Sequence, residues 1–188
     1  SAPGPCPASC RGPFAPLCPP SFCVFVLSAC RFVFSGGDKY DNIRIGLNSR
    51  LDTLQAAVLL AKMDFFEEEL AACEQVAERY TRRLEGAVQT PHILENRQSA
   101  WAQYVICLKD AEERGRVIAN LQAAGIPSAV YYKKPMHRQA AFAGKQVEAV
   151  SCLETVSLCE RCLALPFHPY MEEEQIEAVC GRILGEIG

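Results

Sequence analysis

The chain has 188 residues, of which 49% are hydrophobic and 22% are charged, with a net charge of −3. This balance is that of one globular domain with a buried core. It excludes the basic face that a nucleic-acid-binding protein needs, and no apolar run reaches the roughly 20 residues that cross a membrane.

Residues 1–35 differ in composition from the rest of the chain. Residues 1–22 are rich in Pro, Cys and Ser, contain no Asp, Glu or Lys, and show neither the helix nor the strand period. Three interpretations are open: a lipid-attachment signal ending at Cys30, a native N-terminal extension, or sequence that is not native to the domain, such as a shifted reading frame. We favour the third and place the domain boundary between residues 35 and 36.

Cysteine is abundant, with 11 in the chain, five of them within the first 30 residues. The other six are scattered singly through helical or strand-like patterns, as small buried hydrophobic residues usually are. We therefore interpret residues 36–188 as a reduced, cytoplasmic domain. The one CxxC pair, Cys159 and Cys162, has no second ligand pair for zinc and is interpreted as packing.

Residues 52–85 predict a single long helix that links this domain to another part of a larger protein. Apolar residues recur in steps of three and four from Leu54 to Leu84. Asp52 and Gln55 fit a capping box, and Gly86 is a natural stop. At about 1.5 Å per residue the helix is roughly 50 Å long, more than a small domain needs.

The remaining pattern alternates strands and helices. It predicts strands at 101–108, 126–132 and 163–165, and helices at 110–124, 147–159 and 172–187. The predicted fold class is α/β, more narrowly a small α+β domain. In it, the long helix precedes a three-stranded sheet with helices on one face.

Two polar clusters are candidate binding sites. Asn48 and Arg50 lie in the loop that opens the long helix, where free backbone N–H groups suit a phosphate or a carboxylate. The alternative is that Asn48 only caps the helix and Arg50 is solvated. The second cluster contains Tyr131, Tyr132 and His137 at the end of a predicted strand and suits a polar ligand. Its alternative is an ordinary surface loop.

His168 lies between two prolines, in Leu165-Pro166-Phe167-His168-Pro169-Tyr170. A single histidine in such a rigid turn is more often structural than catalytic. The sequence alone therefore assigns it no chemistry.

Three runs together resemble the DegT/DnrJ/EryC1/StrS family of nucleotide-sugar aminotransferases. They are KYDNIRIGLNSRLDTLQAAVLLAK from Lys39, IPSAVYYKKPMHRQAAF from Ile126 and LALPFHPYMEEEQIEAV from Leu163. The resemblance covers about residues 36–188. It implies the C-terminal domain of a fold-type I, pyridoxal-phosphate-dependent homodimer that moves an amino group from glutamate onto a nucleotide-linked keto-sugar.

The resemblance also implies residue roles. Asn48 reaches across the dimer interface to the phosphate of the cofactor in the other subunit. Arg50 contacts the substrate sugar, or its carboxylate if the sugar is a hexuronate, and Tyr131 and Tyr132 line the sugar pocket. His137 matches a family position and is placed with the substrate-binding residues. Arg50 beside the tyrosine pair favours a hexuluronate substrate.

The sequence departs from the family pattern at the catalytic lysine. The family carries its Schiff-base lysine upstream of the segment that corresponds to Gly36-Gly37-Asp38, whereas the first lysine here is Lys39, in the turn after the expected place. We therefore expect the chain alone to be inactive. Two other classes stay open: a non-catalytic module that associates through the long helix, and a redox or metal protein built on the cysteines.

Overall fold

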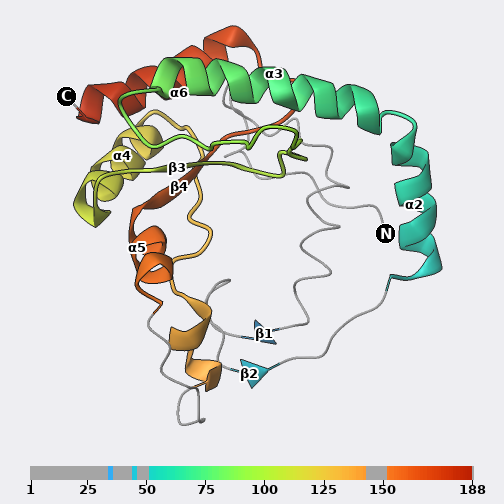
Figure 1. Cartoon of the computed structure of the whole chain (residues 1–188), viewed down its shortest axis with the longest axis horizontal. Coiled ribbons are helices and arrows are strands. Elements are labelled where there is room, and N and C mark those ends of the chain that lie inside the picture. Colours follow the sequence, from blue (N-terminus) through green and yellow to red (C-terminus); the bar gives the residue numbers. More distant parts are fainter. Residues whose placement is uncertain (1–33, 36–43, 46–50, 143–151, 188) are drawn as a thin grey trace.

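The computed structural model describes residues 34–35, 44–45, 51–142 and 152–187 (Figure 1). Its elements, in chain order, are β1 (Phe34–Ser35), β2 (Arg44–Ile45), α2 (Thr53–Met63), α3 (Phe66–Leu84), β3 (Tyr104–Cys107), α4 (Ala111–Ala123), the short 3-10 turns η2 (Met136–Arg138) and η3 (Ala140–Phe142), α5 (Leu153–Arg161), β4 (Cys162–Leu165) and α6 (Glu173–Ile187).

The described strands pair in two small antiparallel sheets. β1 pairs with β2, and β3 pairs with β4 in a register that places Tyr104 opposite Leu165 and Ile106 opposite Leu163. Single bridges extend the second sheet on both edges, from Gln89 to Cys107 and from Ala129 to Ala164. Side chains alternate between the two faces of a strand, so one face of this sheet carries the large apolar residues.

Three helices cover that apolar face. α3 and α6 run side by side above the sheet in Figure 1, and α4 packs against α6 at the end near the C-terminus. The core takes Tyr80 and Leu84 from α3, Leu121 from α4, and Ile176 and Ile183 from α6, all with no exposed surface. The α+β class and the placement of these helices on one face are confirmed.

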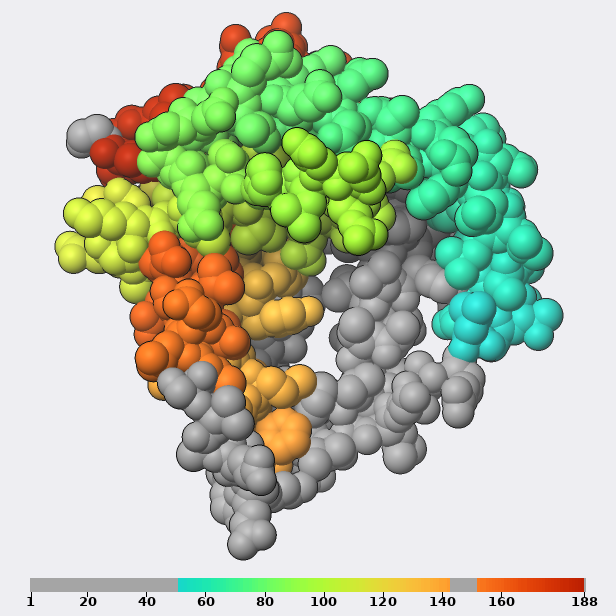
Figure 2. Space-filling view, viewed as in Figure 1, coloured from blue at the N-terminus to red at the C-terminus, as the bar shows by residue number. Residues whose placement is uncertain are grey.

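The long linking helix is interrupted, so the prediction of one continuous helix is wrong. α2 ends at Met63, the chain turns at Asp64 and Phe65, and α3 begins at Phe66. The three glutamates in the first turn of α3, Glu67 to Glu69, favour a new N-terminus there through the helix dipole. α2 leaves the compact part of the molecule, at the right of Figures 1 and 2, and has no buried residue.

The prediction of a strand at 126–132 is also wrong, because this segment pairs with β4 through a single bridge. Ala129 exchanges both backbone hydrogen bonds with Ala164, at 3.1 and 2.7 Å. The next hydrogen-bonded position along this ladder would join Pro127 to Pro166, and neither proline has an N–H to donate. The sheet therefore has two strands where we expected three.

The other helix and strand predictions fall close to the observed bounds. α4 and α6 begin within one residue of the predicted starts, and Gly125 and Gly86 adopt positive φ angles of 70° and 81° after α4 and α3. α5 is confirmed from Leu153, whereas the predicted beginning of that helix at residue 147 lies outside the described residues. Within the described parts of the chain, no helix combines the length and apolar composition of a membrane span.

α4 and α2 begin with the same kind of N-cap but differ in how they pack. Asp110 accepts a hydrogen bond from the Glu113 N–H at 2.8 Å and caps α4, whose Leu121 is fully buried. Asp52 accepts from the Gln55 N–H at 2.8 Å and caps α2, which has no fully buried residue. We expect Asp110→Ala to lower the free energy of unfolding by about 1 kcal/mol. Asp52→Ala should leave the global transition in denaturant unchanged and reduce only the helical circular-dichroism signal; equal losses would contradict this.

Candidate functional site

The first predicted cluster, Asn48 and Arg50, lies outside the described residues. The chain is described again from Leu51, and Asp52 forms the predicted capping box with Gln55: the Asp52 N–H donates to the Gln55 Oε1 at 3.4 Å and its carboxylate accepts in return. Immediately before the gap, β2 lies against η3. The strand that leads into this loop therefore approaches the segment that carries the second cluster.

The second cluster begins just beyond the bridge at Ala129. Tyr131 is half-buried and Tyr132 is 59% exposed, and their rings meet edge to face with centroids 6.0 Å apart. The peptide bond between them is cis. The Cys162 thiol donates to the Tyr131 carbonyl oxygen over 3.7 Å, which ties this pair to β4. Tyr132 thus presents its ring to solvent from an anchored backbone.

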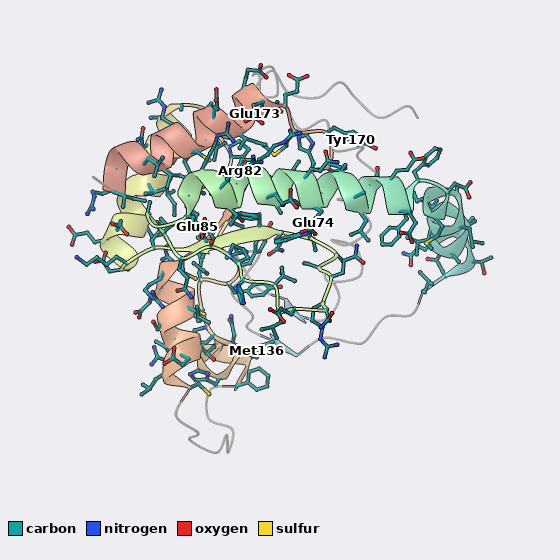
Figure 3. The ribbon with its side chains drawn as sticks, turned by 45° about the horizontal axis from the view of Figure 1, so that its top comes forward. Glu74, Arg82, Glu85, Met136, Tyr170 and Glu173 are labelled. Carbon is teal, nitrogen blue, oxygen red and sulfur yellow. The ribbon has the colours of Figure 1, made fainter. Side chains whose placement is uncertain are left out.

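His137 is exposed in η2, six residues beyond Tyr131. The turn that carries it is fixed from inside, because the buried Gln139 side chain donates to the Lys134 carbonyl oxygen at 3.2 Å. Met136 in the same turn is 51% exposed and lies well below α3 in Figure 3. Tyr131, Tyr132 and His137 therefore belong to one segment on which Tyr132 and His137 are exposed and Tyr131 is half-buried.

His168 has a structural role in the described geometry. Its Nδ1 accepts a hydrogen bond from the Tyr170 N–H at 3.2 Å, and burial lowers the pKa of its imidazole. The Tyr170 hydroxyl in turn donates to Glu69 at 2.7 Å and joins this turn to α3. The neutral imidazole holds the turn before α6, in agreement with the sequence interpretation.

Two open clefts of the described surface lie along α3, away from the predicted residues. One of about 410 Å³ runs between α3, which contributes Glu74, Arg82 and Glu85 (Figure 3), and the 91–101 loop. The Trp101 Nε1 donates to Glu74 at 2.5 Å. The other, of about 480 Å³, is lined by Arg79, Arg82, Arg83 and Glu173. Neither is lined by Tyr131, Tyr132 or His137. Sequence reasoning missed both, because they depend on how α3 packs against other segments.

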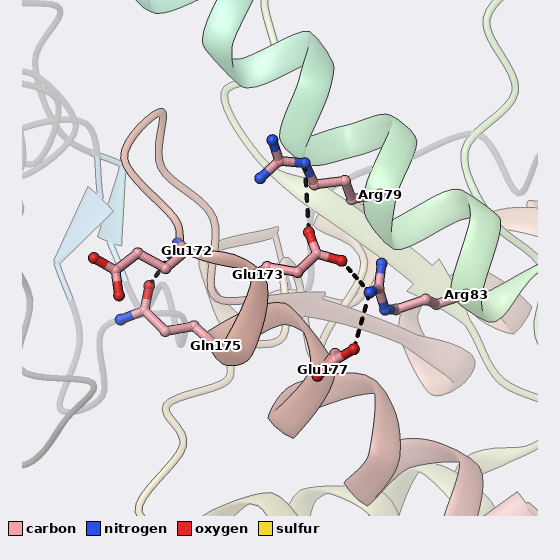
Figure 4. Close-up of polar contacts among 6 residues, drawn as sticks. All are labelled: Arg79, Arg83, Glu172, Glu173, Gln175 and Glu177. Carbon is pink, nitrogen blue, oxygen red and sulfur yellow. Dashed lines mark hydrogen bonds and ion pairs between the residues drawn. The ribbon is translucent and has the colours of Figure 1, made fainter.

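Ion pairs between α3 and α6 join residues that line this second, arginine-lined cleft (Figure 4). Glu173 pairs with Arg79 at 3.6 Å and with Arg83, and Arg83 also reaches Glu177 at 3.3 Å. The charges of Arg79 and Arg83 are thus compensated within the chain. Partly exposed pairs of this kind contribute little to stability and mainly fix how α6 sits on α3.

The described residues do not form a site for the pyridoxal ring that the resemblance implies. Lysines in the described part of the chain are Lys62, Lys109, Lys133 and Lys134, and none of these lines either cleft. A Schiff-base lysine has to meet the cofactor in a protected pocket. Within the same residues, no group of three His, Cys, Asp or Glu side chains could hold a metal ion.

Comparison with known proteins links these segments to one family. The profile of the DegT/DnrJ/EryC1/StrS aminotransferase family matches residues 24–184. The UDP-2-acetamido-2-deoxy-3-oxo-D-glucuronate aminotransferase of Pseudomonas aeruginosa is 38% identical over 146 residues, which are 77% of this chain and 39% of that protein. The pleiotropic regulatory protein of Geobacillus stearothermophilus is 34% identical over 160 residues, or 82% of this chain and 42% of that protein.

Solved structures give the same relationship. An aminotransferase of this kind from Brucella abortus superposes with a TM-score of 0.67 at 43% identity, covering 86% of this chain and 42% of that one. S. venezuelae DesV, solved with a ketimine intermediate, gives a TM-score of 0.67 at 26% identity over 82% of this chain and 41% of that one. The chain spans about two fifths of the length of the curated relatives it matches.

Proposed function

Since the chain belongs to the DegT/DnrJ/EryC1/StrS aminotransferase family, we propose that it forms the C-terminal part of a pyridoxal-phosphate-dependent enzyme. This enzyme transfers an amino group from glutamate to a nucleotide-linked keto-sugar, in the cytoplasm, for the synthesis of amino sugars or surface polysaccharide. The observation that carries the proposal is the match over residues 24–184, which includes every predicted site residue.

We propose that the substrate is a hexuluronate, a keto-sugar that also carries a carboxylate. The Pseudomonas aeruginosa relative is named for a 3-oxo-glucuronate, and Arg50 offers the bidentate guanidinium that recognises a carboxylate. Tyr132 exposes its ring from an anchored backbone, which suits stacking on a sugar. His137, on the same segment, contributes a hydrogen bond to a sugar hydroxyl.

Asn48 is proposed to donate a hydrogen bond to the phosphate of the cofactor held by a second subunit. When bound, pyridoxal phosphate supplies the electron sink that amino transfer needs. None of the four described lysines lines either cleft, which supports a Schiff-base lysine elsewhere in the intact enzyme. This chain's own residues then bind and orient the sugar and the cofactor phosphate.

The intact enzyme is proposed to be a homodimer with α2 in its interface. If Asn48 serves the other subunit, α2 begins only a few residues from that subunit. Leu54, Leu60 and Met63 are 81%, 71% and 60% exposed, although a helix that is apolar on all sides is normally buried. The same exposed residues support the alternative function, a non-catalytic module that associates through this helix.

A chimera tests the proposed activity. Residues 36–188 replace the matching segment of the Pseudomonas aeruginosa aminotransferase, and product formation is measured with glutamate and its 3-oxo-glucuronate substrate. We expect transamination by the chimera. Arg50→Ala should reduce kcat/KM for the carboxylate sugar by roughly 30-fold, since removing one partner of a buried charge pair costs at least about 2 kcal/mol.

The controls separate the substrate from the reaction. Arg116→Ala, on the exposed side of α4, should leave the kinetics unchanged, and a substrate without the carboxylate should be insensitive to Arg50→Ala. The isolated chain, treated with pyridoxal phosphate and borohydride, should gain no more label than its surface lysines explain. A folded chimera inactive on every keto-sugar would contradict the proposed activity, whereas activity independent of Arg50 would contradict only the hexuluronate.

A further inference from the structure

Cys107 and Cys162 face each other across the β3–β4 ladder. The neighbouring opposed pair, Leu108 and Arg161, is hydrogen-bonded through the Leu108 N–H at 3.1 Å, whereas Cys107 exchanges its backbone hydrogen bonds with Gln89 on the other edge. Hydrogen-bonded and non-hydrogen-bonded pairs alternate along an antiparallel ladder. The two cysteines therefore occupy a non-hydrogen-bonded pair.

This position suits a disulfide. Opposed residues at a non-hydrogen-bonded pair have Cα atoms about 4.5 Å apart with side chains on the same face. Disulfides span Cα separations of about 4.4–6.8 Å, so only a small adjustment is needed. Both residues are free thiols, Cys107 half-buried and Cys162 only 6% exposed. Cys107 is thus the sulfur that a small reagent can reach.

The Cys162 thiol also contacts the backbone of Tyr131, and this contact exists only while the sulfur is reduced. It donates to the Tyr131 carbonyl oxygen over 3.7 Å, and a disulfide sulfur has no hydrogen to donate. Burial raises the pKa of the Cys162 thiol, the Cys107 thiol raises it further, and the Arg114 guanidinium acts in the opposite direction. Cys162 is therefore held as the thiol, which is less reactive than a thiolate, and is not the sulfur that the oxidant attacks first.

We propose that Cys107 and Cys162 are a redox-active pair that a hydroperoxide converts into a cross-strand disulfide, which removes the Cys162 hydrogen bond to the Tyr131 carbonyl oxygen and loosens this segment on β4. The hydroperoxide oxidises the Cys107 sulfur to a sulfenic acid and is reduced to an alcohol or water. The Cys162 sulfur then attacks the Cys107 sulfur. The S–S bond forms, the S–O bond breaks, and the hydroxyl leaves with the Cys162 proton as water. Thiols restore the pair, and the chemistry stands whether or not Tyr131 contacts a sugar.

Peptide mapping of the full chain after hydrogen peroxide tests the pair. Trypsin cuts after Arg161 and so separates Cys159 from Cys162, and chymotrypsin cuts near Phe167 and separates Cys162 from Cys180. We expect a dithiothreitol-sensitive Cys107–Cys162 peptide pair, lighter by two hydrogens than the sum of its parts. It should vanish in Cys107→Ser and persist in Cys73→Ser. Free thiols at both positions, or a Cys159–Cys162 link instead, would overturn the proposal.

Hydrogen exchange tests the link to Tyr131. Amides of the peptide that covers residues 129–134 should exchange several-fold faster in the oxidised chain than in the reduced chain. Oxidised Cys107→Ser, which keeps the Cys162 thiol, should exchange at the reduced rate. Unchanged exchange in a chain that carries the disulfide would overturn the coupling to Tyr131.

Discussion

Replacing Tyr80 by alanine is expected to lower the free energy of unfolding by about 3–5 kcal/mol, the usual cost of deleting a buried aromatic side chain. Tyr80 has no exposed surface and stacks on Tyr104 with ring centroids 5.1 Å apart. Its hydroxyl donates to the Pro166 carbonyl oxygen at 2.9 Å, one residue beyond β4. One side chain thus joins α3 to the sheet and to the turn before α6.

Two further variants separate the contribution of the Tyr80 hydroxyl from that of burying the ring. Tyr80→Phe keeps the ring and leaves the Pro166 carbonyl without its donor, which should cost about 1–3 kcal/mol. Tyr132→Ala removes a tyrosine that is 59% exposed, and should change stability by no more than about 0.5 kcal/mol. Equilibrium unfolding in urea measures all three. Equal midpoints for Tyr80→Ala and Tyr132→Ala would contradict the packing described here.

The pH dependence of unfolding follows from ionisation of the buried Tyr80 hydroxyl. Burial raises the pKa of the Tyr80 hydroxyl far above its usual range, and the Tyr104 pKa is raised by burial as well. A group whose pKa is higher in the folded state adds stability below its unfolded pKa, about 10 for tyrosine, and loses it as the pH rises further. Tyr80→Phe should therefore lose less stability than the natural chain above pH 10 or so.

Local signals in the sequence predicted most of the helix ends. The Asp52 and Asp110 side chains both cap the helices expected of them, and Gly86 and Gly125 both take positive φ angles. These devices act through atoms three or four residues apart. A short window of sequence therefore contains the whole interaction, which is why periodicity and capping residues were sufficient.

Of the two errors, one came from an interaction that no short window contains and the other from a local signal that was outweighed. The strand expected around Ala129 stops because Pro127 would have to pair with Pro166, thirty-nine positions along the chain by their numbers. The break at Asp64 and Phe65 has a local signal, the three glutamates that follow, but the uninterrupted apolar spacing outweighed it. Periodicity specifies which face is apolar and does not by itself specify whether two helices are one.

The candidate site also contains residues that the sequence predicted, whereas the cysteine pair near it was not predicted. The sequence placed Tyr131, Tyr132 and His137 on one segment, and the structure describes them there with their backbone anchored. The sequence contained no signal that Cys107 and Cys162 lie opposite each other, because the register of a sheet depends on which strands pair. Asn48 and Arg50 remain predictions from the loop chemistry and the family resemblance.

The apolar surface of α2 is expected to drive self-association of the isolated chain. Leu54 and Leu60, on α2, are 81% and 71% exposed. Burying a leucine contributes about 1.5–3 kcal/mol, so Leu54→Gln with Leu60→Gln should remove about 3 kcal/mol from each protomer's contact. This weakens association by at least roughly 100-fold. Glutamine is a good helix former, so α2 should persist. Sedimentation velocity over a micromolar concentration series measures the change.

A matched control separates this helix from exposed leucines in general. Leu94 and Leu153 are 65% and 74% exposed on other parts of the chain, and their double replacement by glutamine should leave the association constant within a few-fold of the natural value. Because Leu54 and Leu60 are both exposed within the chain, the α2 variant should keep the urea midpoint of the natural monomer. A natural chain that stays monomeric at micromolar concentration would contradict a dimer interface on α2. An equal loss of association in both double variants would show that exposed apolar surface in general, and not α2, drives the association.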